Sequence, residues 1–185
     1  MAYLTEAELR RKFRLTTDSL QVTASAILKE ATTTTFDVFL SHSSKEPEPI
    51  LAGIKIYLEE AGFSVYVDKY TDPLIAEDGV TKRTASILRR RMRQSKSLLY
   101  VHSRFSKSSR WMPWELGFFD GHKGKVGVLP VTLQQEELFK GEEYLNLYPY
   151  VDVTEHNGSK YYWIHKSRHE WLGFGKWIGG QDFPK

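Results

Sequence analysis

Short blocks of hydrophobic residues follow one another along this chain with two different spacings. The densest blocks are short, mostly apolar runs, which are typical of strands buried on both faces of a sheet. Each run is bounded by polar residues, glycine or proline, which favour turns. The strands predicted in this way are 36–40, 63–68, 97–102, 125–131 and a short fifth one within 148–153.

Between these runs the apolar residues recur at helical spacing. In segment 49–61, Ile50 and Ile54 fall on one helical face, and Gly62 is a typical residue just beyond a helix end. Further helices are predicted at 81–94, which is basic, and around the aromatic cluster 109–121. Strands and helices that alternate in this way form βαβ units, so we expect a parallel sheet with helices on both faces.

Two additional segments flank this alternating pattern. Residues 3–31 have helical spacing, and Thr5 followed by Glu8 resembles a capping box. The C-terminal segment is rich in aromatic residues and is predicted to form a helix and a tail that pack on the domain. The predicted organisation is therefore an N-terminal helical extension (1–33), a main domain (34–155) and a C-terminal helix and tail (156–185).

Composition narrows the class of protein. The chain has 185 residues, of which 41% are hydrophobic and 26% charged, as in ordinary globular domains. It contains no cysteine, which excludes disulfides, thiolate metal sites and cysteine nucleophiles. A net charge of +3 is too small to indicate nucleic-acid binding. Without an apolar run of about 18 residues or an apolar leader, we expect a soluble, cytoplasmic protein that binds no membrane.

Polar side chains gather where the predicted strands end. The first strand ends in Ser41 and His42, the second in Asp68 and the third in His102 and Ser103, and the helix that carries Glu115 follows. Ligands of parallel sheets bind at the carboxyl ends of the strands, so we expect a site at this edge. Ser41 and His42 are neighbours on a strand and point apart, which argues against a nucleophile pair and favours a role in lining a pocket.

Glu115 lies in an aromatic cluster that has two interpretations. A glutamate that follows Ser108 or Ser109 at a helix start is a common capping arrangement. Alternatively, the cluster forms the wall of a pocket for a flat, charged ligand. Trp111 shares a helical face with Glu115 if the helix begins by residue 110, although Pro113 biases the preceding residue away from helical angles. The other aromatic residues of the cluster, Trp114, Phe118 and Phe119, are predicted to be packing residues.

The ordered set of motifs resembles the Toll/interleukin-1 receptor (TIR) domain family. The resemblance covers roughly residues 34–153, and it is carried by Phe36–His42, Gly62–Asp68, Ser97–Ser103 and the pair Trp111 and Glu115. It implies a flavodoxin-like, three-layer α/β/α fold with a five-stranded parallel sheet. It also implies that residues 69–80 form the mobile loop between the second strand and the second helix.

The resemblance has functional implications as well. Bacterial antiphage members of the family, of the Thoeris-like type, have a glutamate at the position of Glu115 and cleave NAD+. They release nicotinamide and form ADP-ribose or a cyclic isomer, with NAD+ as the substrate and no separate cofactor or metal. A downstream effector that senses the nucleotide product is also implied. Other members are non-enzymatic adaptors, and an enzyme of similar fold acting on other nucleosides is a third possibility.

A single carboxylate suits this chemistry. Nicotinamide leaves as a neutral base, so the group in need of stabilisation is the oxocarbenium-like ribose, which an ionised Glu115 can stabilise. The helix N-terminus favours a negative charge, so we expect Glu115 to be ionised. Trp111 is expected to stack on a ring of the substrate. Ser41, His42 and Ser103 are expected to bind substrate, and Asp68 either binds substrate or braces the loop.

The basic segment 81–94 has three interpretations. A solvated helix face is the simplest one. Self-association through this helix and the loop 69–80 is implied by the TIR resemblance. Nucleic-acid binding is the weakest interpretation, because the segment lacks interleaved aromatic residues. In the C-terminal segment, His165 and His169 are spaced like metal ligands on a helix, but without a third ligand we expect a surface pair.

Overall fold

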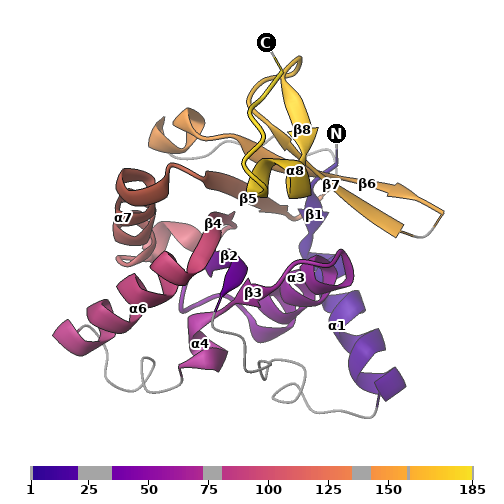
Figure 1. The fold of residues 1–185 in the computed structure, drawn as a ribbon. Helices are drawn as coiled ribbons and strands as arrows, with labels where there is room; N and C mark the ends of the chain where they lie inside the picture. The colour runs from indigo at the N-terminus through magenta and orange to yellow at the C-terminus, as the bar shows by residue number, and fades with distance from the viewer. Residues whose placement is uncertain (1, 21–34, 73–80, 135–142, 158, 185) are drawn as a thin grey trace.

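A mixed β-sheet flanked by helices forms the centre of the protein in the computed structural model, which describes residues 2–20, 35–72, 81–134, 143–157 and 159–184 (Figure 1). The strands are β1 (Leu4–Thr5), β2 (Phe36–Ser41), β3 (Val65–Tyr66), β4 (Ser95–His102), β5 (Val126–Thr132), β6 (Tyr150–His156), β7 (Ser159–His165) and β8 (Trp171–Gly173). The helices are α1 (Glu6–Leu20), α3 (Glu48–Glu60), α4 (Asp68–Thr71), α6 (Lys82–Gln94), α7 (Met112–Lys123) and α8 (Phe174–Ile178), with 3-10 turns η1 (Ser106–Ser108) and η2 (Glu143–Leu147).

The predicted α/β fold is confirmed in its main features. The strands follow one another across the sheet in the order β3-β2-β4-β5-β6-β7-β8, and the first five of these run parallel. The βαβ crossovers explain this arrangement, since parallel neighbours need a connecting helix. The segment 69–80, predicted as a loop, begins with helix α4, and residues 73–80 lie outside the described residues.

The sheet extends beyond the five predicted strands, because the C-terminal segment adds two antiparallel ones. β6 and β7 form a hairpin in which Val151 lies opposite Ile164, and β8 pairs with β7. Tyr162 and Ile164 alternate with more exposed neighbours and pack on the core, as strand residues do. The helix predicted in this segment is limited to α8. The hairpin crosses residue 155, and the division into a domain with two additions stays a prediction.

The N-terminal segment also begins with a strand that the sequence did not reveal. β1 runs parallel to β5, with Leu4 opposite Val131 and Thr5 opposite Thr132. On its other side, the backbone N–H of Val153 in β6 donates to the carbonyl of Ala2 over 2.9 Å. β5 and β6 pair directly at Val128 and Tyr150, and β1 lies between them farther along, where it completes the sheet. Helix α1 follows at once, and the predicted helical residues 21–31 lie outside the described part of the chain.

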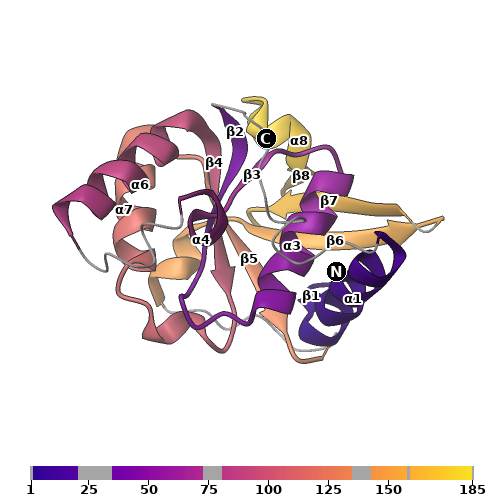
Figure 2. The ribbon, with the colours of Figure 1, turned by 90° about the horizontal axis from the view of Figure 1, so that it is seen from below.

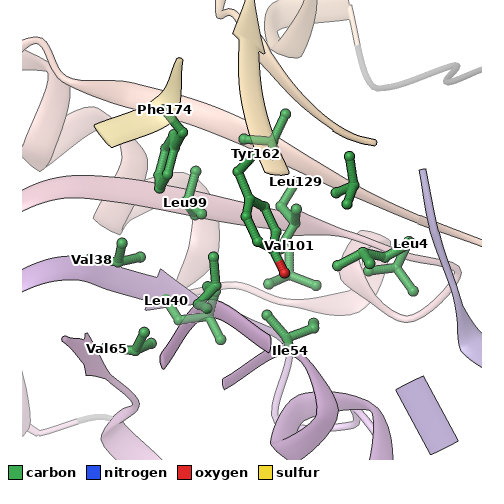
Figure 3. Close-up of a cluster of buried hydrophobic side chains, with 14 of the residues drawn as sticks. Leu4, Val38, Leu40, Ile54, Val65, Leu99, Val101, Leu129, Tyr162 and Phe174 are labelled. Carbon is green, nitrogen blue, oxygen red and sulfur yellow. The ribbon is translucent and has the colours of Figure 1, made fainter. Parts of the chain in front are cut away.

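Helices cover both faces of the sheet and create two hydrophobic cores. Helices α6 and α7 lie on one side of β2, β4 and β5, and α3 and α1 lie on the other (Figure 2). In the core on the side of α3, Leu40, Val101 and Leu129 of the strands belong to one buried cluster with Ile54 of α3 (Figure 3). Tyr162 and Phe174 extend the same core toward the C-terminal segment. The sheet therefore has helices on both faces, as predicted.

Helices α1 and α3 approach each other closely at a glycine. A Cβ atom on Gly53 of α3 would lie 2.5 Å from the carbonyl oxygen of Leu9 in α1, so only glycine fits there. This approach fixes the N-terminal helix against the domain. None of the helices in the described residues has the length and apolar character needed to cross a bilayer.

Candidate active site

Helix α7 presents Glu115 to the sheet rather than to its own N-terminus. The Oγ atom of Ser109 accepts a hydrogen bond from the N–H of Met112 over 3.3 Å, and so it caps the helix. Trp111 has helical dihedral angles, and its carbonyl accepts the N–H of Glu115 over 2.9 Å. Pro113 stands in the first turn, where its missing N–H costs nothing. The capping role is therefore filled by Ser109, and the Glu115 side chain is directed elsewhere.

The carboxyl group of Glu115 is buried against the end of β2. Glu115 is only 4% exposed, and its Oε2 atom accepts a hydrogen bond of 2.6 Å from the Oγ of Ser41. Ser41 is itself 1% exposed and is the last residue of β2. The structure thus brings together two predicted site residues that are 74 positions apart.

His42 and Asp68 form a second pair beside the first. The Nε2 atom of His42 lies 2.7 Å from Oδ1 of Asp68, and its Nδ1 atom lies 3.0 Å from the carbonyl oxygen of Ser43. Both ring nitrogens thus face acceptors, an arrangement that favours the doubly protonated ring. Burial is the largest single effect and opposes the charge on the ring, but Asp68, the Ser43 carbonyl and the Glu115 charge together outweigh it and raise the pKa of His42. Asp68 also accepts the N–H of Lys69, so it braces the start of α4.

Burial favours the neutral form of both Asp68 and Glu115, but the net shift of the pKa is downward for Asp68 and upward for Glu115. Burial disfavours the charged form of Asp68, but His42 and the N–H of Lys69 hold its pKa below the ordinary value. For Glu115, burial and then the nearby Asp68 charge raise the pKa to about 7, against the smaller opposing effects of Ser41 and His42. We expected the helix start to keep Glu115 ionised, but burial raises its pKa so far that the carboxyl group is only partly ionised at neutral pH.

Ser103 lies on the other side of the sheet and does not approach Glu115 through any hydrogen bond among the described residues. Its Oγ atom donates to Oε2 of Glu46 over 2.7 Å, and both residues are buried. Burial raises the pKa of Glu46, against the hydrogen bond from Ser103. The Oε1 atom of Glu46 has no hydrogen-bond partner within the described chain. Sequence reasoning missed Glu46, because an acidic residue in a polar turn carries no sign of burial.

Trp111 joins an aromatic row on α7. Its ring is half-buried and lies 5.1 Å from that of Trp114, edge to face, and Trp114 stacks in turn on Phe118 at 6.0 Å. Arg89 and Arg93 of α6 lie over the rings of Trp114 and Phe118, each at 5.6 Å. The basic helix is therefore not only a solvated face, because the aromatic residues absent from its own sequence are supplied by α7.

Two other sequence features lie away from this site. Arg91 of the basic helix forms a two-pronged ion pair with Asp72, at 2.8 and 3.2 Å. His165 is 7% exposed and lies 3.4 Å from Asp152, so the expected surface pair with His169 is wrong: β7 carries only the first of them. Within the described ranges, no group of three His, Cys, Asp or Glu residues could hold a metal ion.

Comparison with known proteins places this geometry in context. The model of the family described as "TIR domain" matches residues 38–162. The protein named "Probable 3' cyclic ADP-D-ribose synthase ThsB'", from Bacillus cereus (strain MSX-D12), is 44% identical over 146 residues, which are 77% of this chain and 75% of that protein. "Putative cyclic ADP-D-ribose synthase TIR2", from Cytobacillus dafuensis, is 32% identical over 84 residues, 45% of this chain and 22% of that protein.

Proposed function

Because the chain belongs to the TIR domain family, we propose that it cleaves the nicotinamide–ribose bond of NAD+ and converts the remainder into a cyclic ADP-ribose signal for antiviral defence. The observation that carries the proposal is the buried Glu115 carboxyl, hydrogen-bonded to Ser41 at the carboxyl edge of the sheet. The relative named as a 3' cyclic ADP-D-ribose synthase supports the cyclic product. Such a protein acts in the cytoplasm, and its product is sensed by a downstream effector.

The reaction needs little acid–base chemistry. The bond between ribose C1′ and the pyridinium nitrogen breaks, its electron pair moves to the nitrogen, and nicotinamide leaves neutral. C1′ then carries an oxocarbenium-like charge, which the Glu115 carboxylate stabilises electrostatically. Capture by a hydroxyl group within the same ADP-ribose, with loss of its proton, gives the cyclic product. Capture by water gives linear ADP-ribose.

The raised pKa of Glu115 fits a cationic substrate. With a pKa of about 7, the carboxyl group is partly protonated at neutral pH in the unliganded protein. The positive charge on the nicotinamide ring of NAD+ favours the ionised form, so substrate binding itself lowers this pKa. Trp111, the residue just before the same helix, is proposed to stack on a flat ring of the substrate. Ser41 and the paired His42 and Asp68 then hold the carboxylate and the neighbouring loop in place.

Incubation with NAD+ and identification of the products by mass spectrometry test the proposal. The wild-type protein should release nicotinamide and form an ADP-ribose product, whereas Glu115→Ala should be folded and inactive. Glu143→Gln is the matched control, because Glu143 is an exposed acidic residue of η2. Nicotinamide release by Glu115→Ala at the wild-type rate would exclude the assigned role.

We also propose that copies of the protein associate through α6 and the segment 69–80. The supporting observation is the row in which exposed Arg89 and Arg93 lie over the half-buried Trp114 and Phe118, a combination common at protein interfaces. Changing Arg89 and Arg93 together to Glu should reduce both the sedimenting assembly and the activity per molecule. Changing Lys176, an exposed cation of α8, to Glu is the control. Association that persists without any NAD+ consumption would instead support the adaptor function.

A further inference from the structure

Glu6 is a buried carboxylate that lies outside the region matched by the TIR family model, residues 38–162. It is the first residue of α1, and its side chain is 8% exposed. Its two oxygen atoms both contact one guanidinium group: Oε1 lies 2.8 Å from Nε of Arg104, and Oε2 lies 3.1 Å from NH2. This two-pronged geometry is the strongest form of a carboxylate–arginine contact. It joins the N-terminal segment to the loop between β4 and α7.

The position of Glu6 is fixed by the sheet rather than by the helix alone. β1 lies between β5 and β6, and Thr5 stands opposite Thr132 at the end of β5. The Oγ1 atom of Thr5 accepts the N–H of Glu8, so helix α1 begins directly at the strand end. Glu6 thus projects from a restrained backbone, and little conformational entropy remains to be lost when it pairs with Arg104.

Arg104 is the second residue of the loop 103–111, which leads to the helix that carries Glu115. The preceding residue, Ser103, holds Glu46 from the neighbouring loop, and the Oγ of Ser106 donates to the carbonyl of Ser103 over 2.8 Å. At its far end the loop supplies Ser109, which caps α7. The guanidinium of Arg104 lies 4.7 Å from the ring of Phe105, which orients it further. These contacts connect Arg104 to the first turn of the helix that carries Glu115.

We propose that Glu6 is a positioning residue for the NAD+ cleavage proposed above, holding Arg104 and the 103–111 loop so that Glu115 stays against Ser41. The inference rests on that proposed function for its kinetic consequence. The N-terminal segment is then part of the catalytic unit, not an appendage to a complete TIR domain. Because Glu6 acts through the loop, its loss should affect the chemical step more than substrate binding. Small displacements of a catalytic group reduce rates by factors of about ten to a hundred.

Four variants test this role: Glu6→Gln, Arg104→Gln, the double variant and Arg104→Lys. Each single change to Gln should lower kcat about tenfold and leave KM nearly unchanged. The double variant should be no slower than the slower single variant, because both changes break the same contact. Arg104→Lys keeps the charge without the planar fork, and its kcat should fall between those of Arg104→Gln and the wild type. Arg10→Gln is the matched control, because its 3.6 Å ion pair with Glu6 stays within α1.

A second readout does not depend on activity. Hydrogen exchange at the amides of residues 104–111 should be faster in Glu6→Gln and Arg104→Gln than in the wild type and Arg10→Gln. If the wild type does not consume NAD+, the proposed function fails and exchange alone decides the positioning role. Additive losses of kcat in the double variant, equal effects of Arg10→Gln, or unchanged exchange would each overturn the inference. Arg104 is 55% exposed, so its variants are expected to fold even if Glu6→Gln does not.

Discussion

Replacing Glu115 with Gln should stabilise the folded protein at alkaline pH. In the folded wild type, burial and the Asp68 charge raise the pKa of this carboxyl group from 4.5 to about 7. The unfolded chain therefore releases its proton at lower pH than the folded protein, and wild-type stability falls as pH rises through this window. Between about pH 5 and about pH 8 the loss amounts to about 2.5 kcal/mol. Gln is neutral throughout and still accepts the hydrogen bond from Ser41.

Urea unfolding at both pH values measures this effect. The difference in free energy of unfolding between Glu115→Gln and the wild type should grow by about 2.5 kcal/mol from about pH 5 to about pH 8. If an N–H group of the buried side-chain amide in Glu115→Gln lacks a hydrogen bond, the resulting cost in free energy of unfolding is the same at both pH values. Glu143→Gln, at an exposed position, should show no such growth. A difference of equal size at both pH values would refute the assignment of the raised pKa to Glu115.

Three other substitutions have expected outcomes. Ser41→Ala removes the hydrogen bond that lowers the pKa of Glu115, so this carboxyl group should ionise at higher pH than in the wild type. Because kcat/KM should rise as Glu115 ionises, its increase should also move to higher pH. A profile of kcat/KM from about pH 5.5 to about pH 9 checks this, and an unchanged profile contradicts it. Gly53→Ala should cost about 1–3 kcal/mol in urea unfolding, because its Cβ would meet the Leu9 carbonyl at 2.5 Å. Gly117→Ala, with open space around it in α7, should instead stabilise by about 0.5–1 kcal/mol, and a loss there would show that the helix face is occupied.

Elements made from long, regular patterns were predictable, and elements made by distant pairing were not. β2, β4 and β5 are buried along almost their whole length, so their apolar runs were clear strand signals. β1 has two residues, which cannot show a period, and only its position between β5 and β6 makes it a strand. The aromatic run that became β7 fits a helix or a strand equally well until β6 is beside it.

The candidate site follows the same distinction. Strand alternation places Ser41 on the face of Phe39, toward the α7 core, and Ser103 on the face of Val101, toward the α3 core. This alternation was available in the sequence and separates Ser103 from Glu115. The raised pKa of Glu115 was not available, because it results from burial by residues far apart in the chain. Glu46 was not predictable for the same reason.

The insertion of β1 between two later strands also sets an order for folding. Leu4 pairs with Val131, and Ala2 accepts the N–H of Val153, so both partners are synthesised more than a hundred residues later. Contacts of such long range slow folding, because the loop must close before the pairing is rewarded. On the ribosome, the gap between β5 and β6 cannot be filled until β6 has emerged. β1 thus finds both of its partners only after β6 has been made, and NAD+ cleavage that depends on Glu6 would begin only when this part of the sheet is complete.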